Sequence, residues 1–301
     1  MTATPDSPGG SGGSGGPGGP SPAYSPSPRP TFEEPTLVTR ERVTRHIWGD
    51  REAGEVMDWI YVSSQTLHVL KFGVAPGQSF RHSEEFRTVF RADELLHVLS
   101  GTMLLANPQT GEVQRIEQGG NVYFGPDTWH HAFAEGPAAL RVLEIFAPPP
   151  SAGTAGTYAR QQPFLSQSRY TRDELLGRLD PTTPPAQTLR PIREADVVHR
   201  REGSVLVSLL VSTSQLTVAS LRVEPGACSD TRSHGGDAMV FVTAGRLVVR
   251  AWYGGQTYVF EAGPDDAVYL PEGAAREVRN VEAEPAQALL GVAPAYLPPG
   301  D

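Results

Sequence analysis

The sequence predicts an all-β protein built from two similar halves. Short apolar runs, each ended by Gly, Pro or Asn, follow one another from about residue 36, and the same order of runs returns after about residue 190. Runs of this length and spacing are typical of antiparallel strands in a sandwich or barrel. Landmarks recur at offsets near 145, as in Gly101 with Gly245 and Pro126 with Pro271, which indicates two copies of one unit in tandem.

The strands follow directly from these runs. In the first unit they are expected at 67–74, 94–100, 102–106, 113–116, 121–124 and 140–146, and in the second at 205–211, 216–223, 238–244, 246–252 and 267–270. The stretch between the third and fourth strands of the first unit, Asn107-Pro-Gln-Thr-Gly111, is typical of a hairpin turn, because Asn and Gly accept the backbone angles that tight turns need.

Changes in composition divide the chain into four segments. These are a Gly/Pro/Ser-rich tail (1–32), a first barrel (36–150), a connector (151–190) and a second barrel (191–297). The tail has no side chains able to form a core, so it is predicted to be disordered. Thr171 with Glu174 three residues later forms a capping-box pattern, which predicts a short helix in the connector.

Charge and cysteine content narrow the class of partner. The net charge of −9 argues against nucleic acid or an anionic membrane surface, and no apolar run approaches the roughly 20 residues that span a bilayer. Cys228 is the single cysteine, so no intramolecular disulfide can form, which fits a reducing compartment. We therefore expect a cytoplasmic protein that acts on or binds a small molecule.

One stretch carries the most specific signal. It runs Gly120-Asn-Val-Tyr-Phe-Gly-Pro126-Asp-Thr-Trp-His-His131, and Pro271-Glu-Gly-Ala-Ala-Arg276 occupies the same place in the second unit. Each unit resembles the cupin family, whose second motif is Gly, five residues, Pro-x-Gly, two residues, His. Its first motif is Gly, five residues, His-x-His, three or four residues, Glu, six residues, Gly. The resemblance implies a bicupin of two jelly-roll barrels, in which a complete barrel binds one divalent metal through three His and one Glu.

The first unit keeps two of these ligand positions in register. Glu94 stands seven residues before Gly101, at the position of the family's glutamate, and His131 stands at the position of the last histidine. Strand alternation turns His97 to the face opposite Glu94, where a packing or interface role is expected, and turns His130 away from His131 toward the outer face or a loop.

The His-x-His pair of the first unit is out of register. Counting back from the glutamate reaches Thr88 and Phe90, whereas counting forward from Gly77 arrives one residue from His82. An insertion after the first ligand would place His82 at the site, with Glu84 as a fourth ligand or a base. The metal ligands implied by the resemblance are then His82, Glu94 and His131.

Two His and one carboxylate form the ligand set of non-haem Fe(II) oxygenases. The resemblance therefore implies an Fe(II) dioxygenase first, with Mn, Ni or Zn, and with isomerase, decarboxylase or cyclase activity, as alternatives. Glu94 and Glu84 are the candidate proton acceptors. The residues expected to line a pocket for a small, aromatic or polyketide-like substrate are Phe80, Phe90, Tyr123 and Trp129. The Arg-, Gly- and Pro-rich composition would suit secondary metabolism.

Other interpretations stay open for the first unit. Glu94 could pair with Arg91 or Arg87, and His131 could be a hydrogen-bonded core residue. The chain would then be a metal-free binding module, or a structural bicupin without catalysis. Cupins often pair through their sheets, so the resemblance also allows a homodimer.

The second unit keeps the spacing but loses most of the ligands. The His-x-His positions hold Arg232 and His234, the glutamate position holds Ala238, and the last histidine position holds Arg276. Two cations at ligand positions would repel a metal, so this barrel is predicted to be degenerate and metal-free. The three basic residues either converge on an anionic group or face solvent at the barrel mouth.

Overall fold

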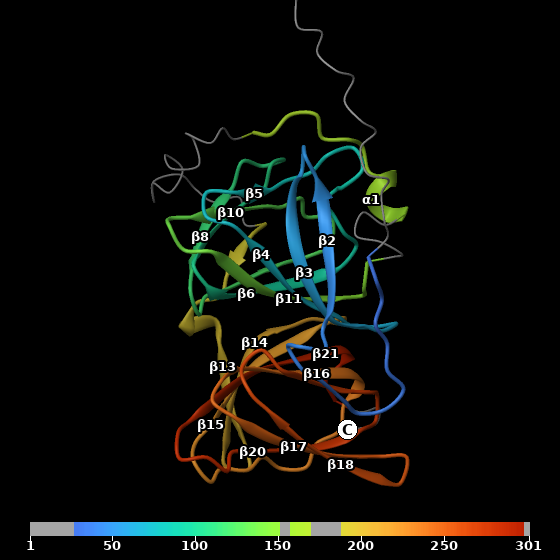
Figure 1. Cartoon of the computed structure of the whole chain (residues 1–301), viewed down its shortest axis with the longest axis vertical. Coiled ribbons are helices and arrows are strands. Elements are labelled where there is room, and N and C mark those ends of the chain that lie inside the picture. Colours follow the sequence, from blue (N-terminus) through green and yellow to red (C-terminus); the bar gives the residue numbers. More distant parts are fainter. Residues whose placement is uncertain (1–26, 151–156, 170–187, 298–301) are drawn as a thin grey trace, which may run out of the picture.

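The computed structural model describes residues 27–150, 157–169 and 188–297, and shows two barrels stacked one on the other (Figure 1). Each barrel is a sandwich of one large and one small antiparallel sheet, with seven and four strands in barrel one and seven and three in barrel two. The α-helix α1 (Thr157–Gln161) lies in the connector, and the short 3-10 helix η1 (Glu194–Asp196) follows just after it. No helix of the described part is long and apolar enough to cross a membrane.

Barrel one has a large sheet in the order β12-β9-β6-β11-β4-β3-β2 and a small sheet in the order β5-β10-β7-β8. Its strands are β2 (Thr44–Asp50), β3 (Gly54–Ser63), β4 (His68–Val74), β5 (Ser79–Phe80), β6 (Asp93–Ser100), β7 (Thr102–Ala106), β8 (Val113–Glu117), β9 (Asn121–Phe124), β10 (His131–Glu135), β11 (Leu140–Ala147) and β12 (Arg190–Pro191).

Barrel two repeats this plan, with sheets in the orders β1-β19-β16-β21-β15-β14-β13 and β18-β17-β20. Its strands are β1 (Thr36–Val38), β13 (Val198–Glu202), β14 (Val205–Ser212), β15 (Thr217–Val223), β16 (Gly235–Ala244), β17 (Leu247–Tyr253), β18 (Gln256–Ala262), β19 (Ala267–Leu270), β20 (Ala275–Arg279) and β21 (Ala286–Ala295).

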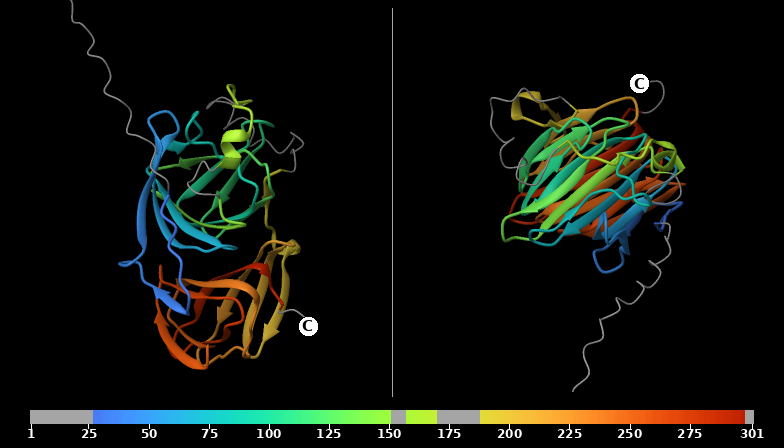
Figure 2. Two further views of the ribbon diagram at one scale, coloured as in Figure 1. Left: turned by 90° about the vertical axis from the view of Figure 1, so that its right-hand side faces the viewer. Right: turned by 90° about the horizontal axis from the view of Figure 1, so that it is seen from above.

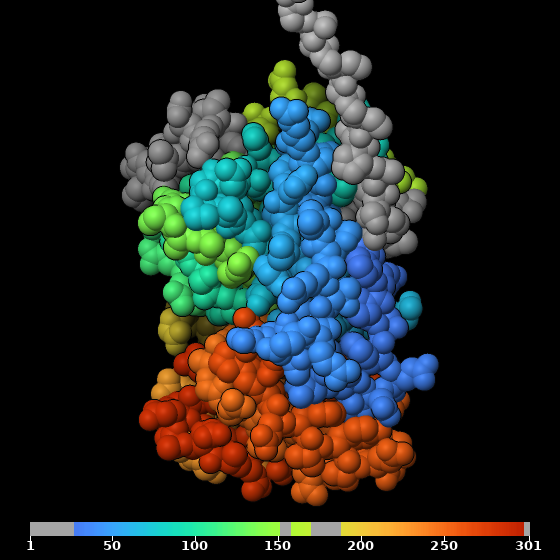
Figure 3. Space-filling model, in the orientation of Figure 1, coloured from blue at the N-terminus to red at the C-terminus, as the bar shows by residue number. Residues whose placement is uncertain are grey.

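Each barrel receives one strand from beyond the boundary expected from sequence. The N-terminal β1 pairs with β19 of barrel two, and β12 of the connector pairs with β9 of barrel one. In Figures 2 and 3 the blue N-terminal segment accordingly runs down from barrel one and lies against the orange barrel two. Two strand pairings thus cross between the halves, in addition to the packing of their faces.

The two large sheets face one another, and their outer sides form a shared apolar core. Tyr61, Leu143 and Ile145 of barrel one are buried there with Met239 and Phe241 of barrel two. The rings of Tyr61 and Phe241 meet edge to face, 5.2 Å between centroids. Opposite Ile145 the second barrel has Gly291, where an added Cβ would lie 2.9 Å from Ile145 Cγ2, so glycine permits the close approach of β21 and β11.

Polar contacts border this shared core. The Lys71 ammonium lies 2.9 Å from the Asp265 carboxylate, and the Tyr61 hydroxyl donates to the Asp265 carbonyl oxygen at 2.8 Å. The Thr213 hydroxyl donates to the Asp93 carboxylate at 2.7 Å. The lysine is buried, so its pairing offsets the cost of removing its charge from water.

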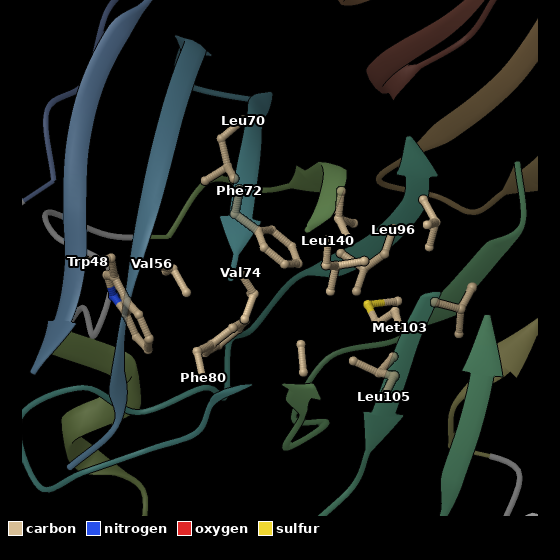
Figure 4. Close-up of a cluster of buried hydrophobic side chains, with 14 of the residues drawn as sticks. Trp48, Val56, Leu70, Phe72, Val74, Phe80, Leu96, Met103, Leu105 and Leu140 are labelled. Carbon is tan, nitrogen blue, oxygen red and sulfur yellow. The ribbon is translucent and has the colours of Figure 1, made fainter. Parts of the chain in front are cut away.

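The inner faces of the sheets form a separate core inside each barrel. In barrel one this core is rich in aromatic side chains, and Figure 4 shows Trp48, Phe72 and Phe80 among the aliphatic residues of β4, β6 and β7. Phe80 makes edge-to-face contacts with Trp48 and Phe72, at 5.2 and 5.6 Å between ring centroids. The core of barrel two consists of smaller side chains, among which alanine is frequent.

The fold class predicted from sequence is confirmed, and every strand expected in either unit is present within a few residues. The predicted tail extends too far, because Arg29 donates to Ser63 Oγ and to the carbonyl oxygen of Ser64 and so belongs to the described fold. Residues 1–26 and the helix predicted from Thr171 lie outside the described residues.

The shared core makes a direct prediction for stability. Phe241→Ala removes a ring that is 1% exposed and contacts both barrels, so we expect a loss of about 3–5 kcal/mol in the free energy of unfolding, measured by urea denaturation. Val259→Ala, at a residue that is 61% exposed, should change it by less than about 0.5 kcal/mol. Equal losses of unfolding free energy in the two variants would contradict the proposed contribution of the shared core to stability.

Candidate functional site

A cluster of ionisable side chains lies inside barrel one. It consists of Glu94 on β6, Glu144 on β11 and His130 immediately before β10, each no more than 8% exposed. One ligand atom from each lies within 4.8 Å of the others, and His130 Nε2 is 4.0 Å from Glu94 Oε2. No other group of three His, Cys, Asp or Glu in the described residues meets this spacing.

Strand alternation places both carboxylates in the interior. Glu94 shares its face of β6 with Leu96 and Val98, which are buried in the core of barrel one. On β11 the inward set is Leu140, Val142, Glu144 and Phe146. Because Phe146 pairs with Glu94 and Glu144 pairs with Leu96, the two acids are diagonal neighbours across the β6–β11 ladder.

His130 presents a free lone pair to the carboxylates. Its Nδ1 lies 3.3 Å from the carbonyl oxygen of Thr128, which can only accept, so Nδ1 carries the hydrogen. Nε2 is therefore an acceptor that faces Glu94 Oε2. Burial lowers the pKa of His130 to about 4, which keeps the ring neutral near pH 7.

The carboxyl groups are held in an environment that disfavours their charge. Burial raises the pKa of Glu94, and the neighbouring Glu144 carboxylate raises it further through charge repulsion and a hydrogen bond. Burial also raises the pKa of Glu144. Asp58 on β3 is a third buried acid, with a pKa raised by burial and then by Glu144. Such a cluster needs a proton or a cation among its oxygens.

A small cavity opens beside this cluster. Its volume is about 30 Å³, close to the share of one water molecule in the liquid. The walls are Trp48, Val56, Asp58, Leu70, Phe72, Phe80, Thr88, Phe90, His130, Glu144 and Phe146. Within the described chain, three buried polar atoms around it have no hydrogen-bond partner: Glu94 Oε2, Thr88 Oγ1 and Trp48 Nε1. A water molecule or an ion in the cavity would satisfy these atoms.

The three ligands predicted from sequence are not brought together. His82 Nδ1 lies 2.6 Å from His131 Nε2, and His82 Nε2 donates to the carbonyl oxygen of Leu165 at 2.7 Å. Both nitrogens of His82 are therefore engaged, and the pair lies outside the barrel core. His131 shares its side of β10 with Phe133, whereas His130 shares the inward side with Ala132 and Ala134.

This reversal of His130 and His131 has a cause in the preceding turn. In barrel two the turn residue with positive φ is Gly273, at 79°, three residues before Arg276. In barrel one it is Asp127, at 65°, three residues before His130. The family motif would put Thr128 there, but a β-branched residue avoids this region and Asp tolerates it. The turn shifts by one residue, so His130 takes the inward place.

The first motif is likewise displaced. The amide of His130 donates to the carbonyl oxygen of Thr88, as the amide of Arg276 does to that of Arg232. Thr88 and Phe90 therefore occupy the His-x-His positions, and the extra residues of this unit precede them. An insertion after His82, as expected from sequence, would have brought that residue inward, so the structure corrects this expectation.

The other predicted site residues divide between the cavity and the surface. Phe80 and Phe90 line the cavity, as expected. Tyr123 points away from it and donates its hydroxyl to Asp93, and Trp129 packs on His82 with 4.8 Å between ring centroids. Glu84 is exposed and its carbonyl accepts from Arg87, so the structure places it apart from Glu94.

Reasoning from sequence missed three of the site residues. Glu144 and Asp58 carry no motif, and their signal is a single acid inside an otherwise apolar inward set on β11 and β3. His130 was assigned to the outer face, and the signal against this was Thr128 in place of the motif's glycine. His97 lies on the face of β6 opposite to that of Glu94, as expected from strand alternation. It lines a separate cavity of about 400 Å³ between the barrels.

The equivalent place in barrel two is basic. Ala238 pairs with Leu270 as Glu94 pairs with Phe124, and Arg276 takes the place of His130. The Arg276 side chain is fully buried, and its Nε donates to His234 Nε2 at 3.2 Å. Its Nη2 lies 3.4 Å from the Glu202 carboxylate. Arg276 and His234 are both buried. The expectation that they face solvent at the barrel mouth is therefore wrong for these two residues.

Residues 219–292 match the family model described as Cupin domain. Barrel two therefore contains a cupin domain. This match lies in barrel two, and the repeated fold places barrel one in the same architecture. No curated protein matches the sequence.

Solved bicupin structures have a similar fold. Oxalate decarboxylase from Lactobacillus farciminis, in a formate complex, is 13% identical with a TM-score of 0.61, over 91% of this chain and 90% of that chain. A point mutant of Bacillus subtilis oxalate decarboxylase is 14% identical with a TM-score of 0.61, over 89% and 80%. A further B. subtilis structure, described with Mn(II) centres, is 14% identical with a TM-score of 0.60, over 88% and 78%. At this identity the likeness shows the fold of the bicupin.

The turn before His130 can be tested at Asp127. Asp127→Gly should keep stability, because glycine adopts positive φ freely, whereas Asp127→Val should lose about 1–2 kcal/mol of unfolding free energy. The side chain is exposed, so lost packing contributes little. Urea denaturation measures both. If the valine variant matched the wild type, the proposed turn conformation would be incorrect.

The acid pair predicts how metal-free protein responds to pH. Because the pKa of Glu94 is raised on folding, its contribution to stability is fully present below the unfolded value of about 4.3 and is lost as the pH rises. After treatment with chelator, Glu94→Gln should therefore melt a few degrees higher than wild type at pH 8, with the gap closing near pH 4. Calorimetry measures this, and the exposed Glu84→Gln is the matched control. A lower melting temperature for Glu94→Gln at pH 8 would contradict the assignment.

Proposed function

We propose that this protein is a metal-dependent cupin enzyme whose single metal site lies in barrel one. The observation that carries the proposal is the pair of facing acceptors, His130 Nε2 and Glu94 Oε2, at 4.0 Å. Two lone pairs buried against each other repel unless a proton or a cation lies between them. A carboxylate oxygen of Glu144 is a third potential ligand atom within 4.8 Å of these two. Glu94 Oε2 has no hydrogen-bond partner among the described residues.

The donor set fits a divalent transition metal. One imidazole nitrogen and two carboxylates are ligands that Mn(II) and Fe(II) accept, and the hydrogen bond from His130 Nδ1 to Thr128 fixes the tautomer that a metal requires. Two carboxylates would neutralise the charge of the ion. A bound metal would polarise an oxygen atom of the substrate as a Lewis acid. Mn(II) or Fe(II) is therefore the proposed cofactor.

The substrate is proposed to be a small organic molecule without permanent negative charge. The cavity walls are aromatic and aliphatic apart from Asp58, Thr88, His130 and Glu144, and no Lys or Arg lines them. Once two carboxylates neutralise the metal, no positive charge remains in the walls to hold a dianion such as oxalate. Phe80 and Phe90 form part of the walls and would offer complementary surface to an aromatic substrate. Such a substrate is larger than the cavity of about 30 Å³, so its binding would require these side chains to move apart.

The reaction is proposed to be oxidation of such a substrate by dioxygen, as in a dioxygenase. Asp58 lines the cavity and is not one of the proposed metal ligands, so it is the group placed to exchange a proton with a bound substrate. Decarboxylation is the second candidate, favoured by the fold shared with the oxalate decarboxylases of L. farciminis and B. subtilis. Isomerase or cyclase chemistry would use the same acid without oxygen.

A metal-free binding module is the alternative from a different class. It is favoured by Thr88 and Phe90 at the His-x-His positions, which leave one histidine in the site. A proton shared by Glu94 and Glu144 would then take the place of the metal. This alternative predicts a stable protein with no metal dependence.

Metal content of purified, reconstituted protein tests the proposal. Elemental mass spectrometry should find about one Mn or Fe per chain, and His130→Ala or Glu94→Gln should lower metal affinity at least about tenfold. His131→Ala and His82→Ala are the matched controls and should retain metal, because these rings lie outside the site. Loss of metal in the controls but not in His130→Ala would restore the set expected from sequence. Wild-type protein without stoichiometric metal would contradict the proposal and favour the metal-free binding module.

The reaction class is tested on the metal-loaded protein. Oxygen consumption with small phenols and enediols should exceed the rate with Glu94→Gln protein at least about tenfold, whereas carbon dioxide release from oxalate should not. Carbon dioxide release without oxygen uptake would favour the decarboxylase.

A further inference from the structure

The interior of barrel two holds a positive charge where barrel one holds acids. Arg276 occupies the place of His130, and its side chain is fully buried. Ala238 stands where barrel one has Glu94, so no carboxylate from that position of β16 meets the guanidinium. The repeat has therefore exchanged an acidic interior for a basic one at the same position of the fold.

A single buried carboxylate forms ion pairs with two guanidinium groups. Glu202 on β13 lies 2.8 Å from Arg200 Nη2 and 3.4 Å from Arg276 Nη2. The Tyr296 hydroxyl also donates to this carboxylate, at 2.7 Å. Burial alone would raise the pKa of Glu202, but Arg276, the Tyr296 hydrogen bond and Arg200 together lower it, so the group is ionised.

The remaining neighbour of Arg276 brings no negative charge. His234 Nδ1 donates to the carbonyl oxygen of Tyr296 at 2.7 Å, and its Nε2 accepts from Arg276. Burial and then Arg276 lower the pKa of His234 to about 4, so the ring is neutral. Arg232 near the mouth has its own partner in Asp230, at 3.5 Å. Arg200 and Arg276 therefore share the single negative charge of Glu202, which leaves one positive charge in excess.

The excess charge coincides with unused donors. In the described part of the chain, Arg276 Nη1 and Arg200 Nε are buried and have no hydrogen-bond partner. A guanidinium nitrogen without an acceptor in the interior carries the full cost of its lost hydration. The residues around Arg276 are small, since Ala251 pairs with it directly and Ala238 and Ala274 face the same core.

We propose that barrel two binds a small carboxylate, of the size of formate or acetate, on the Arg276 guanidinium. The Nη1 hydrogens donate to the carboxylate, and Arg200 is the second cation beside it. On Arg276 only Nη1 is free, because Nε donates to His234 and Nη2 pairs with Glu202. One carboxylate oxygen would accept from Nη1 and the other from the unpartnered Nε of Arg200, whereas a spherical anion offers a single acceptor atom. This site does not depend on the metal proposed for barrel one.

Thermal unfolding in the presence of small anions tests the site. At constant ionic strength, formate and acetate should raise the melting temperature of wild type in a saturable way, because a ligand that binds only the folded state stabilises it. Chloride and the neutral isostere formamide should not. Arg276→Met should weaken formate binding about 10- to 100-fold, and Arg279→Met, at a half-exposed arginine of the same strand, should not.

Several outcomes would overturn the proposal. Equal stabilisation by chloride would make this a general anion site, and equal stabilisation of Arg276→Met would remove Arg276 from it. If Arg276→Met does not fold, titration calorimetry of wild type with formate against formamide decides, since absence of formate binding rejects the site. The metal content of barrel one, measured on the same samples, should be unchanged, so the two proposals fail separately.

Discussion

The face-to-face packing of the two seven-stranded sheets is the constraint on which the rest of the molecule depends. It buries both faces of the central strands, so β4 has no exposed residue along its length. Alternate residues then serve two cores, one between the barrels and one inside each barrel. A shift of one residue would exchange these sets. The interface therefore fixes which side chains of β6 and β11 can reach the interior.

Because of that constraint, each polar residue in the interior has a large effect on stability and on what the interior can bind. An inward position is surrounded by apolar side chains, and a charge placed there must be neutralised or paired. Barrel one concentrates three acids and a neutral imidazole at one end of its core. Barrel two, at the same place, has a buried guanidinium and one acid shared between two arginines. The fold is common to both, while the sign of the interior charge differs.

The sequence predicted the fold and the interior position of Glu94, because both rest on periodicity and spacing. Alternating apolar runs and repeated turn residues survive in both units. The ligand set was misplaced because it rests on single-residue register. Asp127 takes the positive φ in place of Thr128, which moves His130 inward, and the extra residues of the first motif lie before Thr88. Glu144 and Asp58 could be recognised only once the partners of β11 and β3 were known, since neither belongs to a motif.

The displaced histidines acquire a different role from the one expected. His82 and His131 form a pair whose outer nitrogen donates to Leu165, and Arg87 donates to the carbonyl oxygen of Gln162. These contacts tie the segment after α1 to the loops beside the cavity, with Phe164 packed against both His82 and Arg87. The same loops carry Thr88, Phe90 and His130. The outer pair thus joins the loops around the inner site but contributes no ligand atom to it.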